Sequence, residues 1–496
     1  MAEFIKIDPA DNVAVAVEPL EAGVVVEVDR ERLTIAEAIP AGHKFALREL
    51  AAHEEVIKYG YPIGHTVAPV VRGGWVNEKN LKTNLDGALD YTYSPVARRR
   101  DKADEMPMFM GYRRRNGEVG IRNELWVIPT VGCVNGTAEA VARLFRQADP
   151  EPGVDAIVAW PHSYGCSQLG DDHNNTRRIL ADMALHPNCG GALIVGLGCE
   201  NNQVSALREL LQDADPERIR FIETQKIEGD EVQAALTLLG ELHRVAREDV
   251  RTPTPLSELR VGLKCGGSDG FSGITANPLL GRFSDLLIAL GGTSVLTEVP
   301  EMFGAETILM NRCRDGATFE ATVRMINDFK EYFIRNDQPV YENPSPGNKA
   351  GGISTLEEKS LGCTRKCGSA TVEDVLAYGD RLRIRGLSLL GAPGNDLVAA
   401  TALAAAGCQM VLFTTGRGTP FGTMVPTMKI STSSPLARSK PHWIDFDAGT
   451  LLDGESWQQC LQRFVALVVE VASGREVNHE KNGFRQIAIF KTGVTL

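Results

Sequence analysis

The chain has 496 residues, of which 43% are hydrophobic and 23% charged, and this length and composition predict a globular protein of two or three domains. Its 52 basic and 64 acidic residues give a formal net charge of −12, which argues against a nucleic-acid partner. The N-terminus lacks a signal-peptide pattern and no apolar run is long enough to span a membrane, so we expect a cytoplasmic protein, with no membrane partner, whose ten cysteines are thiols.

Residues 1–90 are predicted to form a small β-rich domain, because short apolar–polar alternations are separated by glycine-containing turns. Residues 91–109 are charged, carry two prolines and show no periodicity, which is typical of a linker. The expected strands of the small domain are 12–20, 24–28 and 31–35, and a short helix is expected at 45–52.

Residues 110–255 are predicted to form a first α/β lobe, since strand-like and helix-like segments alternate as they do in a parallel sheet with crossover helices. The expected strands are 124–133, 155–166, 192–199 and 219–224, and the expected helices are 136–148, 174–185, 203–214 and 230–248.

Residues 256–496 are predicted to form a second α/β lobe of the same kind. The long turn-rich loop 339–352 lacks periodicity, and loops of this length are often functional. The expected strands are 259–267, 293–300, 382–393 and 409–418, and the expected helices are 281–292, 317–334 and 395–407.

Gly-Cys pairs end three successive strands of the first lobe, at Cys133, Cys166 and Cys199, each 33 residues after the last. Cys265 takes the equivalent place in the second lobe. Ligands of open parallel sheets bind outside the carboxyl ends of the strands, so this series favours a site. The alternative is that small residues simply ease the turn into the next helix, and the sequence leaves both readings open.

The loops after these strands carry side chains suited to a polyhydroxylated anionic small molecule, since lysine and arginine bind carboxylates while amides, hydroxyls and aspartates bind hydroxyl groups. Neither a phosphate-binding G-x-x-x-x-G-K-[ST] loop nor a dinucleotide-binding G-x-G-x-x-G follows a strand, so we expect neither ATP nor NAD. The candidate residues in the second lobe include Lys264, Asp269, Lys349, Asn395, Arg417 and Thr419.

The cysteines also suggest iron. Three cysteines at neighbouring strand ends could hold an iron–sulfur cluster, could lie near a single Fe(II) ion, or could be no more than small residues. Cys363 and Cys367 are four residues apart, a weaker signal than a CxxC pair. His43 lies between a turn glycine and Lys44 at the expected helix start, where it is either a functional residue or an exposed helix-entry histidine.

Several long motifs follow one another along the chain: GHKFAL (42–47), VIKYGYPIG (56–64), HSYGCSQLGDDHNN (162–175), GLGCENNQ (196–203), LKCGGSDGFSGITANP (263–278), PGNKAGG (346–352) and TTGRGTPFG (414–422). Together and in this order they resemble the altronate dehydratase / galactarate dehydratase family, most strongly its altronate branch. The resemblance covers essentially the whole chain.

The resemblance implies an N-terminal SAF-type β-clip domain and a two-part catalytic region. It implies a hydro-lyase of carbohydrate acid metabolism and hexuronate catabolism. Such an enzyme would eliminate water from D-altronate to give 2-keto-3-deoxy-D-gluconate, with Fe(II), replaceable by Mn(II), as Lewis acid. Cys363 and Cys367 fall at positions that are not cysteines in the galactarate branch, which favours mononuclear iron over an iron–sulfur cluster at that pair.

On this basis we assign hypothetical roles. His43 or His162 would be the acid or base, with Lys44 and Lys264 stabilising charge, and the metal would lie near His43, Cys166 and Cys199. Arg417 and Lys349 would bind the substrate carboxylate, while Asp269, Asn395 and Thr419 would bind hydroxyl groups. The expected partner is a sugar acid, and the expected assembly is a homodimer. Two alternatives stay open: a dehydratase of galactarate or another aldonate, and a non-catalytic sugar-acid-binding or iron-responsive protein.

Overall fold

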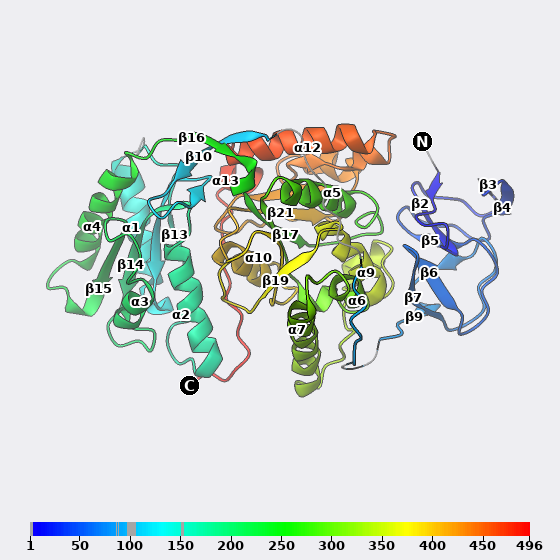
Figure 1. The fold of residues 1–496 in the computed structure, drawn as a ribbon, viewed down its shortest axis with the longest axis horizontal. Helices are drawn as coiled ribbons and strands as arrows, with labels where there is room; N and C mark the ends of the chain where they lie inside the picture. The colour runs from blue at the N-terminus through cyan, green and yellow to red at the C-terminus, as the bar shows by residue number, and fades with distance from the viewer. Residues whose placement is uncertain (1–2, 86, 88, 97–105, 150–152) are drawn as a thin grey trace.

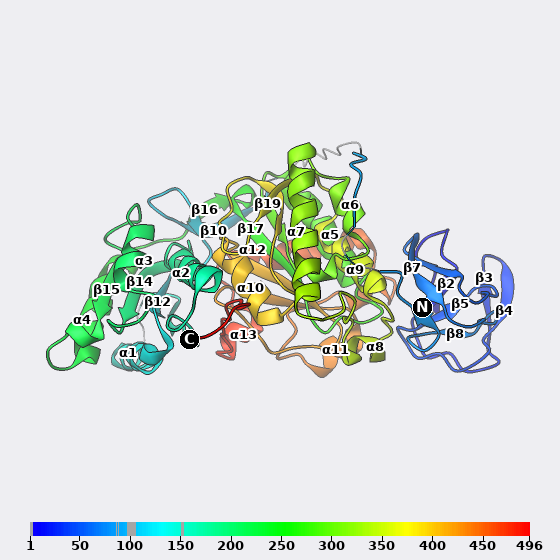
Figure 2. The ribbon, with the colours of Figure 1, turned by 90° about the horizontal axis from the view of Figure 1, so that it is seen from below.

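The computed structural model describes residues 3–85, 87, 89–96, 106–149 and 153–496. These residues form three units in a row, with the second α/β lobe in the middle and the N-terminal unit and the first lobe on opposite sides of it (Figures 1 and 2). Residues 97–105 of the expected linker lie outside the described part of the chain.

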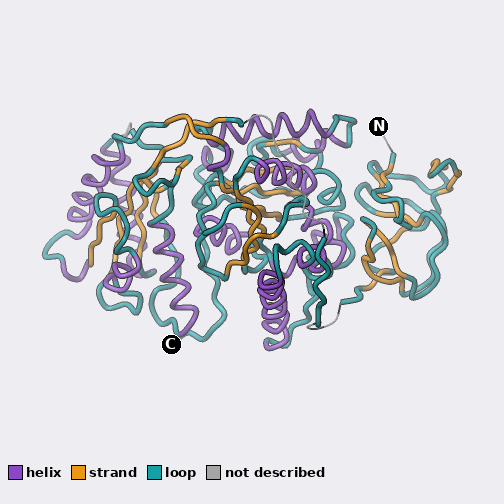
Figure 3. The backbone as a smooth tube through the Cα atoms, viewed as in Figure 1, coloured by secondary structure: helices purple, strands orange, loops and turns teal. Residues whose placement is uncertain are grey.

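The N-terminal unit consists of short antiparallel strands and loops (Figure 3). Its sheets have the strand orders β1-β2-β5-β8, β3-β4 and β6-β7-β9. The strands are β1 (Phe4–Ile5), β2 (Val13–Ala16), β3 (Val25–Val28), β4 (Glu31–Thr34), β5 (Lys44–Ala46), β6 (Glu55–Lys58), β7 (Tyr61–Thr66), β8 (Trp75–Val76) and β9 (Leu81–Lys82).

The helix expected at residues 45–52 is wrong. Lys44–Ala46 is instead strand β5, which pairs with β2 and β8, and Leu50 makes a bridge with Val70. Phe45 and its neighbour Ala46 are fully buried in two different apolar clusters, one on each side of the backbone. A strand points successive side chains to opposite faces, whereas a helix would place both on nearly the same side.

The first lobe is built on the parallel sheet β13-β12-β14-β15. Alternate residues of its central strand face opposite layers of helices: Leu125 packs with α1 and α4, and Trp126 with α2. The elements are β12 (Glu124–Pro129), β13 (Ala156–Ala159), β14 (Cys189–Gly196), β15 (Ile219–Glu223), α1 (Asn135–Ala148), α2 (Gly170–Ala184), α3 (Val204–Leu210) and α4 (Glu231–Ala246).

A small antiparallel sheet has the order β11-β10-β16. Two of its strands precede the elements of the first lobe in the chain, and the third follows them. Its strands are β10 (Met108–Arg113), β11 (Val119–Gly120) and β16 (Thr252–Pro255). Strand β10 therefore begins inside the segment 91–109 that the sequence suggested was a linker. Tyr91 and Tyr93, at the start of that segment, bind the second lobe through hydrogen bonds to Glu306 (2.5 Å) and to the Cys313 carbonyl (2.6 Å).

The second lobe contains an all-parallel sheet of seven strands in the order β19-β20-β18-β17-β21-β22-β23. The strands are β17 (Arg260–Cys265), β18 (Thr293–Leu296), β19 (Val372–Leu376), β20 (Gly386–Leu390), β21 (Met410–Thr415), β22 (Thr427–Ser431) and β23 (Phe446–Asp447). The helices are α5 (Ala276–Ala289), α6 (Glu306–Met310), α7 (Gly316–Arg335), α8 (Pro346–Ala350), α9 (Leu356–Thr364), α10 (Asp396–Ala405), α11 (Ser434–Ser439), α12 (Trp457–Ala472) and α13 (Asn478–Lys481).

The C-terminal segment crosses from the second lobe to the first (Figure 1). The backbone amides of Thr492 and Gly493 donate to the Asp172 carboxylate at the start of α2, at 2.9 and 2.6 Å. The amide of Leu496 donates to the Ser167 carbonyl at 3.0 Å. The loop that precedes α2 is thus covered on one side by the end of the chain.

Among the described residues, no helix is long and apolar enough to cross a membrane.

Candidate active site and metal centre

The candidate site lies at the carboxyl edge of the seven-stranded sheet. The chain enters this sheet at its central strand β17, adds β18 to β20 on one side, and then returns to add β21 to β23 on the other. Such a reversal leaves a crevice outside the carboxyl ends of the central strands, which is where open α/β sheets bind ligands. Strand β17 ends at Cys265 and β21 at Thr415, so their loops border this position.

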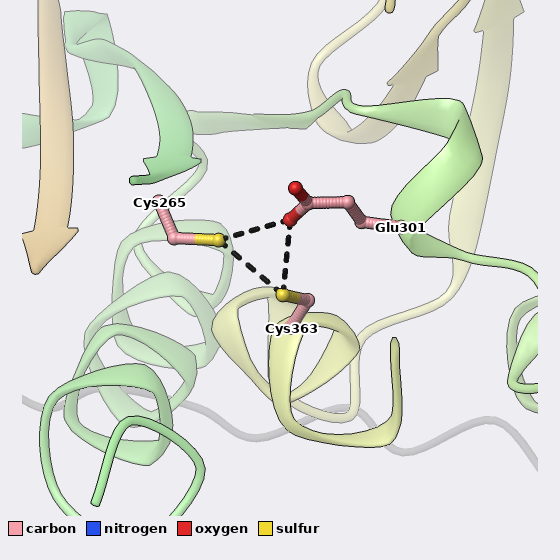
Figure 4. A group of neighbouring side chains, drawn as sticks. All are labelled: Cys265, Glu301 and Cys363. Carbon is pink, nitrogen blue, oxygen red and sulfur yellow. Dashed lines mark hydrogen bonds between the residues drawn. The ribbon is translucent and has the colours of Figure 1, made fainter. Parts of the chain in front are cut away.

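A buried group of two thiols and one carboxylate lies at this edge (Figure 4). The Sγ atoms of Cys265 and Cys363 are 3.3 Å apart, and each lies 3.2 Å from Glu301 Oε2. Cys265 ends β17, Glu301 follows β18 in a short 3₁₀ turn (Val299–Glu301), and Cys363 comes from α9. Among the described residues, this is the one group of three or more cysteine, histidine, aspartate or glutamate side chains whose ligand atoms all lie within 4.8 Å of one another.

Three buried lysines surround the group and neutralise the carboxylates of Glu301 and of the neighbouring Glu298. Lys359 binds Glu301 at 2.7 Å, Lys366 binds Glu298 at 2.7 Å, and Lys264 binds Glu298. Burial disfavours the charged form of Glu301, but the charges of Lys359 and its neighbouring lysines outweigh this and hold the pKa of the carboxyl well below its usual range. The hydrogen bond with Cys265, together with burial, raises the pKa of the Cys363 thiol.

Lys264 is fully buried and has two carboxylate partners. Besides Glu298 it binds Asp396 Oδ1 at 2.8 Å, and Asp396 retains 35% exposure at the edge of the sheet. Although burial disfavours the ammonium, these carboxylates raise the pKa of Lys264. It is therefore a fixed cation that stabilises negative charge, as the sequence suggested, and it cannot act as a base near neutral pH.

The donor set fits one divalent, moderately soft metal ion. Two thiolates and a carboxylate are ligands typical of iron or zinc sites, and three protein ligands leave a position open for a substrate oxygen. A divalent ion would replace the two thiol protons of Cys265 and Cys363 with no change in net charge, because it carries the same charge as the two protons. The lysines already balance the neighbouring carboxylates. The ligand atoms would have to separate by roughly half an ångström to reach the spacing around a tetrahedral ion.

Four glycine-containing loops converge beside this group. A Cβ atom on Gly270 would lie 1.9 Å from the Gly42 carbonyl oxygen, and one on Gly352 would lie 2.2 Å from the same atom. A Cβ on Gly416 would lie 2.1 Å from Asp269 Cγ. Only glycine permits such close approach. The GHK, CGGSDG, PGNKAGG and TTGRG motifs therefore meet in space, although they are far apart in the sequence.

His43 reaches the second lobe from the N-terminal unit of the same chain. Its Nδ1 accepts a hydrogen bond from Trp75 Nε1 at 3.2 Å, and its Nε2 lies 3.3 Å from the carbonyl oxygen of Ala350. These contacts are those of a neutral imidazole that carries its proton on Nε2. Burial lowers the pKa of His43 and outweighs the hydrogen bond with the Ala350 carbonyl, which raises it; this also favours the neutral ring.

A buried ion triad holds His43 in this position. Glu358 on α9 binds Lys44 at 2.8 Å and Lys58 at 2.7 Å, and all three side chains are at most 1% exposed. Lys44 donates further hydrogen bonds to the Gly352 carbonyl and to Ser354 Oγ, at 3.0 and 2.7 Å. Burial lowers the pKa of Lys44, while the lysine charges overcome burial and lower the pKa of Glu358 to about 2.

The five expected substrate-binding residues all border the converging loops, but they differ in their contacts. Lys349 and Arg417 form no ion pair within the described part of the chain, and Arg417 is exposed. Asp269 instead accepts hydrogen bonds from Phe271 N, Ser272 Oγ and Thr432 Oγ1. Asn395 caps α10 by accepting from Val398 N, and Thr419 accepts from Phe421 N, so these two side chains also have structural contacts.

The remaining predicted residues lie in the first lobe, on the far side of the second lobe from the N-terminal unit (Figures 1 and 2). The structure does not bring His43, Cys166 and Cys199 together as one metal-ligand group within the described residues. His162 is buried, with Nε2 2.8 Å from the Pro129 carbonyl oxygen and Nδ1 accepting from Tyr164 N at 3.1 Å. Both ring nitrogens bind backbone groups, and burial lowers the pKa of His162, so this geometry favours a structural role.

Sequence reasoning missed three residues of the second-lobe centre, Glu298, Glu301 and Lys359, and it raised Cys363 only as part of a weak CxxxC pair with Cys367. The positions of the two glutamates do carry a signal, since both follow strand β18 at the same sheet edge as Cys265. Lys359 carries none that is specific, because it lies on a helix whose nine residues are all buried.

Family models match all three units of the chain. The altronate/galactarate dehydratase SAF domain matches residues 2–84, the D-galactarate dehydratase/altronate hydrolase second domain matches 111–247, and the D-galactarate/altronate dehydratase C-terminal domain matches 256–495. The chain is 56% identical to altronate dehydratase of Escherichia coli (strain K12) and 54% identical to altronate dehydratase of Bacillus subtilis (strain 168), in each case over 100% of both chains.

The chain belongs to the altronate/galactarate dehydratase family. Galactarate dehydratase (L-threo-forming) of Escherichia coli (strain K12) is a more distant relative, 33% identical over 96% of this chain and 94% of its own. Membership of this family confirms the resemblance inferred from the sequence motifs and the SAF-type fold of the N-terminal unit. The acid–base, substrate-binding and metal-binding roles of individual residues stay predictions.

Proposed function

We propose that this chain eliminates water from D-altronate to give 2-keto-3-deoxy-D-gluconate, with Fe(II) held by Cys265, Glu301 and Cys363. The observation that supports the reaction most strongly is a buried metal-type donor set at the sheet edge where ligands of this fold class bind, with Lys349 and Arg417, which form no ion pair among the described residues, in loops at the same edge. The end-to-end identity to the two altronate dehydratases supports altronate as the substrate.

The reaction removes a proton from C2 and a hydroxyl group from C3 of the sugar acid. The C2 proton is weakly acidic because only the adjacent carboxylate can take up the developing charge. A bound divalent ion supplies Lewis acidity to oxygen atoms of the substrate. Mn(II) is expected to substitute for Fe(II), because the carboxylate and the open position suit both ions.

Arg417 and Lys349 bind the substrate carboxylate in this proposal. Arg417 contacts the β17 loop, because its backbone amide donates to the Gly267 carbonyl at 2.9 Å. Its guanidinium offers paired donors to a carboxylate. Lys349 lies in α8 beside Ala350, the residue that faces His43. The two cations thus place the carboxylate between the β17 loop and the N-terminal unit.

His43 and Asp396 transfer the protons. The neutral His43 ring carries its proton on Nε2, so it can protonate the departing C3 oxygen. Asp396 is partly exposed, and its Oδ1 atom binds Lys264. A Cβ atom on Gly266 of the β17 loop would lie 2.6 Å from the other carboxylate oxygen, Oδ2. Oδ2 thus borders the β17 loop, which Arg417 also contacts, and would accept the C2 proton of the substrate.

The proposal is tested with purified protein loaded anaerobically with Fe(II) and incubated with D-altronate, galactarate and other sugar acids. We expect the thiobarbiturate reaction for 2-keto-3-deoxy acids with D-altronate, and kcat lower by ~10²–10⁴-fold for Asp396→Asn. Glu258→Gln is the matched control, because it removes a carboxylate that pairs with Arg385 just before β17, at the opposite edge of the sheet, and it should retain most of kcat. Absence of the product with every sugar acid would refute a dehydratase, and product from galactarate alone would refute the choice of altronate.

We further propose that the enzyme acts as a homodimer in the cytoplasm. All ten cysteines are free thiols, including seven that are buried, which suits a reducing compartment. Light scattering of the purified protein measures the assembly, and a monomer at micromolar concentration would contradict the dimer.

A further inference from the structure

The three exposed cysteines of the chain lie together in the first lobe, remote from the site described above. Cys133, Cys166 and Cys199 are exposed, whereas the other seven cysteines are buried. They follow β12, β13 and β14, which are neighbours in the order β13-β12-β14, so Cys133 comes from the middle strand. Since these strands are parallel, all three thiols are placed at the same edge of the sheet.

Hydrogen bonds between the loops hold the three cysteines close to one another. Next to Cys133, the Gly132 amide donates to the Tyr164 carbonyl at 2.9 Å. On either side of Cys166, the Ser167 amide donates to Asn201 Oδ1 and the Gly165 carbonyl accepts from the Asn202 amide, both at 2.9 Å. The two outer loops therefore join directly across the end of the middle strand, and each cysteine is within three residues of such a contact.

Two of the three sulfur atoms accept hydrogen bonds. Gln225 Nε2 donates to Cys199 Sγ at 3.4 Å, and Ser167 Oγ donates to Cys166 Sγ at 3.9 Å. By contrast, the buried Cys313 thiol donates to the Leu309 carbonyl, as a protonated thiol does. Donors aimed at sulfur stabilise a thiolate and tune bound iron, so this environment is that of metal ligands.

The spacing argues against a single ion held by all three sulfurs. Around one tetrahedral ion, thiolate sulfurs stand about 3.8 Å apart. The three sulfurs do not form a group within 4.8 Å of one another in the described residues. In a multinuclear cluster each thiolate binds a different iron, so the sulfurs stand further apart. Gly165 and Gly198, the residues before Cys166 and Cys199, have positive φ values of 100° and 125°, which gives the loops room to turn around such a group.

We propose that Cys133, Cys166 and Cys199 ligate an iron–sulfur cluster of the cubane type and leave its fourth iron without a cysteine ligand. On ligation each S–H bond is replaced by an S–Fe bond, and the three protons pass to solvent. The exposed edge of the first lobe gives the open iron access to an oxygen-containing small molecule. This second iron site is separate from Cys265, Glu301 and Cys363 and does not depend on the reaction proposed for them.

The test is anaerobic reconstitution of the full chain with ferric iron, sulfide and dithiothreitol. Iron, acid-labile sulfide and the visible absorption caused by charge transfer from sulfur to iron are then measured. We expect about four labile sulfides per chain in the native protein. Each of Cys133→Ser, Cys166→Ser and Cys199→Ser should lose most of this sulfide. Cys189→Ser is the matched control, because Cys189 begins the same strand β14 at the opposite edge of the sheet, and it should keep the full amount.

A second measurement on the native protein avoids any effect of the substitutions on folding. In the reconstituted protein, iodoacetamide should fail to label Cys133, Cys166 and Cys199, and removal of the iron by a chelator should make all three reactive. The proposal is overturned if the native protein binds no labile sulfide, if the triple serine variant keeps its sulfide, or if the three thiols react equally before and after chelation. Binding of iron without sulfide would likewise exclude a cluster.

Discussion

Replacing Glu358 by glutamine is expected to separate the N-terminal unit from the second lobe and so to withdraw His43 from the site. Glu358 is the shared anion between Lys44 and Lys58, with nitrogen–oxygen distances of 2.8 and 2.7 Å. Both lysines belong to the N-terminal unit and Glu358 to α9. The glutamine variant keeps the shape of the side chain but removes the one charge that holds two buried ammonium groups.

The magnitude follows from the burial of all three side chains, each at most 1% exposed. Removing one partner of a buried, hydrogen-bonded ion pair costs ~3–5 kcal/mol, because the remaining charge is left uncompensated in a medium of low dielectric constant. Here two cations lose their partner. A cost of ~3–5 kcal/mol lowers the equilibrium constant for docking of the unit by roughly 10²–10⁴-fold, at 1.4 kcal/mol for each factor of ten.

Glu357 provides a matched control on the same helix. It also faces the N-terminal unit, where it accepts hydrogen bonds from Thr83 Oγ1 and from the Asn84 amide. Burial raises the pKa of Glu357, and no lysine or arginine pairs with it in the described part of the chain. Glu357→Gln therefore removes far less charge stabilisation, and we expect only about 1 kcal/mol from the altered hydrogen bonds.

Docking is measured by the radius of gyration in small-angle scattering and by the first transition in denaturant unfolding, and activity by formation of the 2-keto-3-deoxy acid. We expect Glu358→Gln to expand the molecule, to add an early unfolding transition and to lower kcat, and Glu357→Gln to resemble the native protein. If both variants remain compact and equally stable, the ion triad does not hold the N-terminal unit and the argument fails.

Three further predictions concern the site itself. Burial lowers the pKa of His43; because His43 is the proposed proton donor and its protonated ring is the stronger acid, kcat should rise as the pH falls through this pKa, and Trp75→Phe, which removes the donor to Nδ1, should raise the pKa of His43 and move this step of the pH–rate profile to higher pH. Cys363→Ser should weaken Fe(II) binding in the sulfide-free protein by more than the ~10–100-fold caused by loss of an outer-shell partner, whereas Cys367→Ser should leave it unchanged in a competition titration. Arg417→Met should lower kcat/KM by ~10–10²-fold, the value of a charge-assisted hydrogen bond, with Arg417→Lys intermediate; equal kcat/KM in all three proteins would exclude the carboxylate contact.

The fold of the two lobes could be predicted from the sequence because their central strands are buried on both faces. Segments such as the one that forms β14, with all eight residues buried, appear as continuous apolar runs between helices. The helix expected at 45–52 failed for the opposite reason. The N-terminal unit has short strands whose identity depends on pairing with distant segments, such as Leu50 with Val70, and a short apolar segment does not by itself distinguish a helix from a strand.

The candidate site was predicted only in part, and the missing part is the one created by tertiary contacts. The loops with Asp269 and Arg417 were found because chemistry-bearing side chains follow parallel strands, and the loop with Lys349 was found because it is long and lacks periodicity. Cys363 contributes from the helix α9, which meets the end of β17 only in the folded chain. No local spacing links it to Cys265, 98 residues away.

Helix α9 connects the two halves of the proposed mechanism. Lys359 and Cys363 are four residues apart and so lie on one face of the helix, where both contact Glu301. Glu358 is one residue earlier, turned about 100° around the axis, and contacts the N-terminal unit. A rigid helix of buried residues therefore fixes the distance between the metal-type group and the unit that carries His43. Because a proton donor misplaced by about 1 Å can cost ~10²-fold in rate, substitutions that shift the N-terminal unit relative to α9 should impair catalysis while the metal group keeps its ligands.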